Sequence, residues 1–186
     1  MPSQRTVAVI VGSLRQASFT RRAAKALEAL APAHLAFTDI PIGALALYNE
    51  ELEADVPPAW KIFRDAVRPV DAVLFATPEY NRSVPGLLKN AIDVGSRPYG
   101  QSVWSGKPAA VVSVSPGAIG GFGANHALRQ SLVFLDMPVL QQPEAYVGGA
   151  AKLFGDDGEV LVDGTREFLR GLMAKFADWI DKTAPR

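Results

Sequence analysis

The fold is decided by one stretch of the sequence, Asp71-Ala72-Val73-Leu74-Phe75-Ala76-Thr77-Pro78-Glu79-Tyr80-Asn81. Its first part, residues 71–76, is the kind of apolar run that forms a parallel strand covered on both faces. Its second part is a turn rich in polar groups, in which proline fixes one backbone angle. In an open α/β sheet, ligands bind just outside the carboxyl ends of the strands. The stretch therefore predicts a buried strand followed by a turn that holds a flat polar ligand.

Strand-like and helix-like segments alternate around this stretch. The expected strands are residues 7–11, 34–37, 71–76 and 108–114, with an interrupted last strand at 139 and 145–147. Apolar residues at helical spacing indicate helices over residues 21–30, 57–67, 87–92, 124–135 and 168–180. Residues 40–56 are an irregular connection, and Asp55 is expected near the cap of the helix that follows. Five strands alternating with five helices predict a doubly wound parallel sheet, in either the dinucleotide-binding order or the flavodoxin-like order 2-1-3-4-5.

The composition is that of an ordinary globular protein. With 186 residues, 48% of them apolar and 20% charged, the chain suits a single domain over residues 1–186. Nineteen basic residues balance nineteen acidic ones, so nothing indicates a nucleic-acid partner. The absence of cysteine excludes disulfides and thiolate sites. No segment resembles a signal peptide or a membrane span, so we expect a cytoplasmic protein that binds no membrane.

The loop after the first strand, residues 12–20, has the character of a phosphate site. It contains a single glycine and no Gly-Lys pair, so it is neither a dinucleotide fingerprint nor a Walker A loop. It carries three hydroxyls and a cation, namely Ser13, Ser18, Thr20 and Arg15, and it leads into a helix whose amino end favours anions. These donors favour a phosphate monoester, as in FMN, over a pyrophosphate. The alternative is that Ser18 or Thr20 only caps the helix and that Arg15 is a solvated charge.

A second loop, residues 115–123, follows the fourth strand and contains four glycines within seven residues. Glycine permits positive φ and a close approach of the backbone to a ligand. If the third and fourth strands are neighbours, this loop lies beside the turn at residues 78–81, and the two hold the edge and one face of an isoalloxazine ring. A mobile glycine turn without a ligand is the alternative.

These residues together resemble the NAD(P)H-dependent FMN reductase family, in particular its chromate, quinone and azo-compound reductase branch. The resemblance spans most of the chain. It is carried by Gly12-Ser13-x-Arg15-x-x-Ser18, by the long motif from Thr77 to Asp93, by Ser115-x-Gly117-x-x-Gly120-Gly121, and by Leu128-Arg129-Gln130 and Pro143-Glu144.

The resemblance implies a flavodoxin-like three-layer fold with bound FMN and with NAD(P)H as co-substrate. The cofactor-binding residues that it implies are Ser13, Arg15, Ser18, Phe19, Thr20, Pro78, Glu79, Tyr80, Asn81, Ser115 and Gly117. Glu79 is expected to act through its backbone. The resemblance also implies a homodimer or homotetramer with each flavin site near a subunit interface.

Two positions depart from the family pattern. Thr20 stands where the family often has Asn, but its hydroxyl still donates to a phosphate. Arg82 stands where the family frequently has an apolar, aromatic or small residue. It either faces the substrate cavity or pairs with a carboxylate at a subunit interface. Candidate substrate contacts are Arg82, Gly120 and His126.

The implied mechanism needs no catalytic side chain, because the flavin carries the chemistry. Hydride passes from NAD(P)H to flavin N5 and then to a small-molecule acceptor in a ping-pong scheme; the acceptors are quinones, azo compounds or metal oxyanions such as chromate. Two alternatives remain: an FMN reductase that supplies free reduced flavin to a monooxygenase, and a flavodoxin-like electron carrier. Zero net charge disfavours the carrier, since acidic surfaces help carriers to dock. His34, expected at the surface, and His126 lack partners at zinc-like spacing, so no metal site is predicted.

Overall fold

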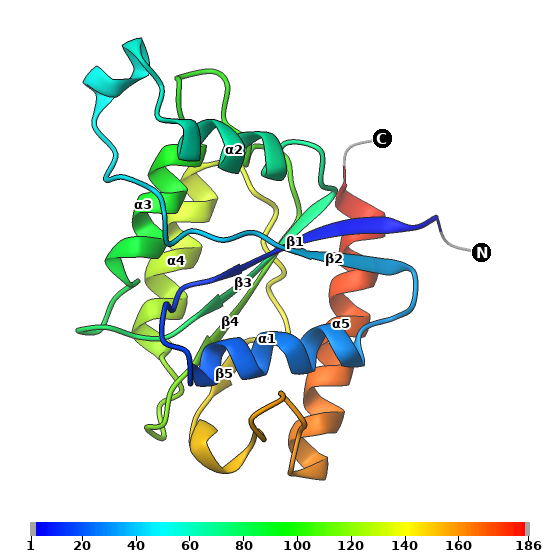
Figure 1. Ribbon diagram of the computed structural model, residues 1–186. Helices are drawn as coiled ribbons and strands as arrows, with labels where there is room; N and C mark the ends of the chain where they lie inside the picture. Colours follow the sequence, from blue (N-terminus) through cyan, green and yellow to red (C-terminus); the bar gives the residue numbers. More distant parts are fainter. Residues whose placement is uncertain (1–2, 185–186) are drawn as a thin grey trace.

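The structure, a computed structural model, describes residues 3–184. Five parallel strands form one sheet in the order β2-β1-β3-β4-β5 (Figure 1). Their bounds are β1 Arg5–Val11, β2 Leu35–Asp39, β3 Ala72–Thr77, β4 Ala109–Val114 and β5 Ala145–Val147. Every residue of β3 and β4 is buried, as expected for strands covered on both faces. The predicted flavodoxin-like strand order is therefore confirmed.

Helices cover both faces of the sheet and make three layers (Figure 1). Helices α1 Phe19–Leu30 and α5 Asp163–Thr183 enclose one apolar core with the sheet. Helices α2 Pro58–Val67, α3 Gly86–Gly95 and α4 Phe122–Phe134 enclose a second core on the opposite face. Two short 3₁₀ helices, η1 Glu50–Ala54 and η2 Ala150–Lys152, lie in connections. Within residues 3–184, no helix has the length and apolarity to cross a membrane.

Some element boundaries differ from the prediction for local reasons. Helix α1 begins at Phe19 rather than at residue 21, because the Ser18 hydroxyl accepts a hydrogen bond from the Arg21 N–H at 3.3 Å and caps the helix. Asp55 ends η1 and gives no cap to α2, which begins directly after Pro57. In α5, Phe168, the first residue of the apolar pattern that predicted this helix, is 40% exposed, and its neighbour Leu169 is buried instead.

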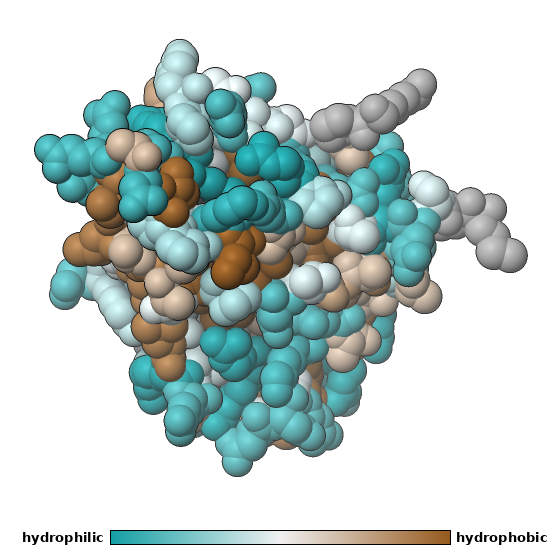
Figure 2. Space-filling view, turned by 45° about the horizontal axis from the view of Figure 1, so that its top comes forward, coloured by the Kyte–Doolittle hydropathy of each residue, from teal (hydrophilic) through white to brown (hydrophobic). Residues whose placement is uncertain are grey.

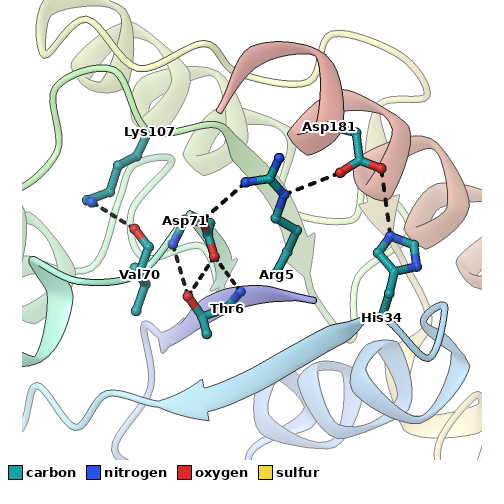
Figure 3. Close-up of polar contacts among 7 residues, drawn as sticks. All are labelled: Arg5, Thr6, His34, Val70, Asp71, Lys107 and Asp181. Carbon is teal, nitrogen blue, oxygen red and sulfur yellow. Dashed lines mark hydrogen bonds and ion pairs between the residues drawn. The ribbon is translucent and has the colours of Figure 1, made fainter. Parts of the chain in front are cut away.

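The amino ends of β1 and β3 are joined by polar side chains (Figure 3). The Asp71 carboxylate accepts hydrogen bonds from the Thr6 N–H at 2.7 Å and the Thr6 hydroxyl at 2.8 Å, and it pairs with Arg5 at 3.3 Å. Arg5 also pairs with Asp181 of α5 at 3.3 Å. The amino edge of the sheet is thus fastened to the last helix.

His34 lies at the border of this group, and with 20% of its side chain exposed it is partly buried, where a surface residue was expected. Its Nε2 has no hydrogen-bond partner among the described residues and lies 3.9 Å from Asp181 (Figure 3).

Lys107, just before β4, binds the segment that follows α2. Its amino group donates to the carbonyls of Arg68 at 3.0 Å and Val70 at 2.7 Å. Burial lowers the pKa of Lys107.

Helix α4 fastens the short edge strand β5 to the sheet. The buried amide of Asn125 donates to the Ala145 carbonyl at 3.2 Å and to the Ser113 hydroxyl at 3.3 Å. The Asn125 carbonyl oxygen accepts from Arg129 at 2.8 Å, and Arg129 also donates to the Leu140 carbonyl at 2.8 Å. Burial lowers the pKa of Arg129. These contacts account for polar residues in the interior of α4.

Candidate functional site

A cavity of about 280 Å³ opens at the carboxyl edge of the sheet, among the loops that follow β1, β3 and β4. We call it the phosphate cavity, after the ligand that the sequence predicts for it. Nine of the eleven predicted cofactor residues line it: Ser13, Arg15, Ser18, Phe19, Thr20, Pro78, Glu79, Tyr80 and Ser115. Asn81 and Gly117 lie in the same loops but outside the lining. The structure therefore brings three loops that are far apart in sequence to one place.

The β1–α1 loop presents free donors to this cavity. Ser13 and Thr20 are buried, yet their hydroxyls bond to no described residue and are not sealed from the cavity. Ser18 caps α1 through its oxygen, which leaves its hydrogen to donate. Arg15 is exposed and has no ion-pair partner among residues 3–184. This donor set fits a phosphate monoester at the positive end of α1.

The turn after β3 is a tight hairpin with Asn81 and Arg82 at its tip. The Tyr80 N–H donates to the Ser83 carbonyl at 3.1 Å, and the Ser83 N–H donates to the Tyr80 carbonyl at 3.0 Å. The φ angles of Asn81 and Arg82 are 51° and 65°, the left-handed values that such two-residue turns require. Left-handed geometry is costly for arginine, so the hydrogen bonds of the turn must hold it.

The carboxylate of Glu79 ties this turn to helix α4. It accepts a hydrogen bond from the Ala124 N–H at 3.0 Å and pairs with Arg82 at 3.3 Å. Gly123 lies so close that an added Cβ would be 2.6 Å from the Arg82 carbonyl oxygen. The side chain of Glu79 thus has a structural role that the sequence interpretation, which gave it only a backbone role, did not foresee. Arg82 has its carboxylate partner within its own turn.

The glycine loop after β4 packs tightly on β5. A Cβ on Gly120 would lie 2.5 Å from the carbonyl carbon of Tyr146, and both Gly120 and Gly121 have positive φ. Gly117 is held by the Ser115 hydroxyl, which accepts its N–H at 3.1 Å. Packing within the protein accounts for Gly120 without a ligand, while Ser115 stays in the lining of the phosphate cavity.

An aromatic cluster lies beside this loop. The His126 ring packs against Phe122 at a tilt of 45°, with ring centroids 4.3 Å apart, and its Nε2 lies 2.8 Å from the Tyr146 hydroxyl oxygen. Burial and the neighbouring Glu144 raise the pKa of Tyr146 to about 12, so the phenol stays protonated at neutral pH. Within the described part of the chain, no group of three metal-ligating side chains is close enough to bind an ion.

A second cavity, of about 490 Å³, adjoins the phosphate cavity across the β1–α1 loop. We call it the β2 cavity. Leu14 of that loop lines it, together with Arg21 of α1, Asp39 at the end of β2, and residues 40–44. Sequence reasoning missed these residues. The sequence did contain one signal: Asp39 is an acidic residue at the end of the second predicted strand, which the flavodoxin-like order places beside the first.

Comparison with known proteins identifies the chain's relatives. A family model described as NADPH-dependent FMN reductase matches residues 5–152. A protein from Pseudomonas putida named quinone reductase is 68% identical over 176 residues, which cover 94% of each chain. A Burkholderia protein named 2-hydroxy-1,4-benzoquinone reductase is 42% identical over 174 residues, covering 94% of this chain and 95% of that protein.

Solved structures agree with the sequence matches. FerB from Paracoccus denitrificans, described as a flavoenzyme NAD(P)H:(acceptor) oxidoreductase, superposes with a TM-score of 0.93 at 45% identity, covering 97% of this chain and 100% of that chain. A flavodoxin variant from Pseudomonas aeruginosa shares the fold, with a TM-score of 0.55 at 18% identity, over 92% of this chain and 99% of that chain. The predicted family, cofactor and enzymatic class are confirmed. The chain belongs to the NADPH-dependent FMN reductase family and is an oxidoreductase whose cofactor is FMN and whose electron donor is a reduced nicotinamide nucleotide.

Proposed function

We propose that this protein is an FMN-dependent NAD(P)H:quinone oxidoreductase. One observation carries the proposal: buried hydroxyls that bond to no side chain or backbone group among residues 3–184 line a cavity at the switch point of the sheet, next to an open turn on which a flat ring can rest. The names of the Pseudomonas putida and Burkholderia relatives support quinones as the acceptors. Azo compounds and chromate are further acceptors that an open site of this kind would admit.

The proposed roles follow from position. The phosphate of FMN is held by Ser13, Arg15, Ser18 and Thr20, with Phe19 beside them. The ring rests on Pro78, Glu79, Tyr80 and Asn81 and meets Ser115 and Gly117. When bound, FMN supplies the N5 atom that accepts and releases hydride. The protein contributes binding and orientation, and we assign it no general acid or base.

Donor and acceptor are proposed to use the same face of the site in turn, which is a ping-pong scheme. Arg82 and His126 are exposed, and we propose that Arg82, although paired with Glu79, is the contact for an anionic acceptor. The alternative that free reduced flavin is the product rests on the description of the family. Flavin retention distinguishes the two functions.

The test begins with the visible spectrum of the purified protein after gel filtration. We expect a flavin spectrum that persists, anaerobic bleaching by NADH or NADPH, and recovery of colour on addition of benzoquinone. Steady-state double-reciprocal plots should be parallel. Flavin lost during turnover, with saturation kinetics toward added FMN, would favour the free-flavin alternative. A protein that binds no FMN would refute the proposal.

We further propose that the protein is a homodimer. Tyr99, Val133 and Phe134 are hydrophobic residues that are 93%, 70% and 84% exposed near the carboxyl ends of α3 and α4. A groove of about 300 Å³ lies between these helices. Figure 2 shows hydrophobic residues gathered toward the left of the view, the side on which α3 lies in Figure 1. A second copy would cover this surface, and sedimentation of wild-type protein and of Phe134→Glu tests the idea.

A further inference from the structure

The β2 cavity has the position and the chemistry of a nucleoside site. It lies at the carboxyl ends of β1 and β2, where Val9 and Asp39 are paired in the strand register. Its volume of about 490 Å³ is within the usual range for ligand pockets. Its walls combine apolar residues, such as Val11 and Ile40, with one acid and one base, Asp39 and Arg21.

The carboxylate of Asp39 is free to bind a ligand. Among residues 3–184 it accepts no hydrogen bond and forms no ion pair, and the residue is exposed. In dinucleotide-binding α/β folds, an acidic residue at the end of the second strand accepts hydrogen bonds from the ribose hydroxyls of the dinucleotide. Asp39 occupies this position although the loop before α1 is not a dinucleotide fingerprint.

The charges around Asp39 favour a ribose diol over a ribose phosphate. Glu28 lies on α1 near Asp39; burial, and then the Asp39 charge, raise the pKa of Glu28. The carboxylates of Glu28 and Asp39 are thus close enough to repel each other, although Glu28 is not in the lining of the cavity. Arg21 also lines the cavity, and its guanidinium donates one long hydrogen bond to the Ser13 carbonyl at 3.4 Å. A 2′-phosphate beside Asp39 would meet negative charge.

The geometry points to the β2 cavity as the binding site for the adenosine half of the electron donor, with Asp39 accepting from the ribose 2′- and 3′-hydroxyls. This assignment rests on the proposed function and makes NADH the preferred donor over NADPH. The β4 and β2 loops are three strand spacings apart, roughly 14 Å. An extended dinucleotide can therefore reach from the ring turn, past the β1–α1 loop, into this cavity.

The decisive measurement is isothermal titration calorimetry of the FMN-loaded protein with ADP-ribose and with 2′-phospho-ADP-ribose. Neither ligand contains nicotinamide, so neither reduces the flavin, and binding is read without turnover. We expect wild-type protein to bind ADP-ribose at least about tenfold more tightly than the phosphorylated form, because a charged hydrogen bond is lost and repulsion is added. Equal affinities, or no binding of ADP-ribose, would overturn the assignment.

Two variants locate the effect at Asp39. Asp39→Asn should weaken ADP-ribose binding about tenfold. Asp39→Ser should reduce the ratio between the dissociation constants of 2′-phospho-ADP-ribose and ADP-ribose. Asp65→Asn, which removes an exposed carboxylate on α2 at the opposite face of the sheet, should change neither affinity. An Asp39→Asn protein that is folded by circular dichroism and binds both ligands like wild type would refute the role of Asp39.

The outcome is separable from that of the proposed function. If NADH still bleaches bound flavin while ADP-ribose does not bind, only the assignment of the β2 cavity fails. If the protein retains no flavin but binds ADP-ribose with the expected preference, the proposed function fails and the nucleoside site stands.

Discussion

The Glu79 carboxylate accepts a hydrogen bond from the backbone N–H of Ala124 at 3.0 Å and so joins the turn after β3 to the amino end of α4. The acid also lies at the positive end of the helix dipole, where negative charge is stabilising. The two loops proposed to hold the flavin ring are therefore held in register by one side chain.

Removing that side chain should loosen the ring turn. Glu79→Ala leaves the Ala124 N–H without its acceptor and should lower the free energy of unfolding by about 1–2 kcal/mol. Flavin should also dissociate several times faster. Urea denaturation and the release of flavin fluorescence measure the two effects. Arg82→Gln, which keeps the bond to Ala124, is the matched control and should change both much less.

The hydroxyls of the β1–α1 loop should contribute to FMN affinity through the phosphate alone. Ser13→Ala and Thr20→Val each remove one donor to a charged group, and each should raise the dissociation constant of FMN about tenfold. Fluorescence titration of the apoprotein measures it. Riboflavin, which lacks the phosphate, is the control ligand. An equal loss of riboflavin affinity would show that these residues act on the ring or on folding.

Glycine 95 should be intolerant of a side chain. A Cβ there would lie 2.5 Å from the buried ring of Trp104, whose Nε1 donates to the Ile92 carbonyl. Gly95→Ala should therefore destabilise the protein by about 1–3 kcal/mol, as overpacking does. Gly171→Ala is the matched control, because Gly171 lies in α5 with nothing within 4 Å of an added Cβ. That change should stabilise by about 0.5–1 kcal/mol in thermal or urea unfolding.

The Asp71 carboxylate should make the free energy of unfolding depend on pH in the acid range. Burial acts to raise the pKa of Asp71, but hydrogen bonds from Thr6 and Arg5 outweigh it and hold the pKa below its usual value. Because the folded pKa is below the unfolded value of about 4, the carboxylate stabilises the fold above that pH. The contribution is lost as the pH falls through the folded pKa.

Asp71→Asn should therefore lower the free energy of unfolding by about 1–2 kcal/mol at pH 7 and by less near pH 3, below the unfolded pKa. Urea denaturation at the two pH values measures the difference. Asp178→Asn, at an exposed position of α5, should have little effect at either pH. A deficit in Asp71→Asn that is equal at both pH values would contradict the account.

Much of the fold was predictable because buried parallel strands are continuous apolar runs. The run at residues 71–76 and the run at 108–114 became β3 and β4 within one residue at either end. The fold was less predictable where α5 first contacts the core. Phe168 and Leu169 are both apolar, and only the packing angle of the helix decides which of them is buried. His34 was misplaced because its burial depends on Asp181, far away in sequence.

The site was predictable where one loop carries several donors, as in the phosphate cavity. It was not predictable where a residue acts across the fold. The bond from Glu79 reaches 45 residues along the chain, and Asp39 and Arg21 line one cavity only because β2 lies beside β1. Such contacts depend on tertiary placement and leave no local pattern.

Asn125 gives helix α4 a second attachment, to the edge strand β5, in addition to the one at Ala124. The first turn of α4 is thus bonded both to the turn after β3 and to β5. A fluctuation that detaches β5 should also free the turn after β3. Amide hydrogen exchange at Tyr146 and at Tyr80 should then report the same opening free energy. Cofactor residence time would in this way be set partly by a strand that contributes no residue to the lining of the phosphate cavity.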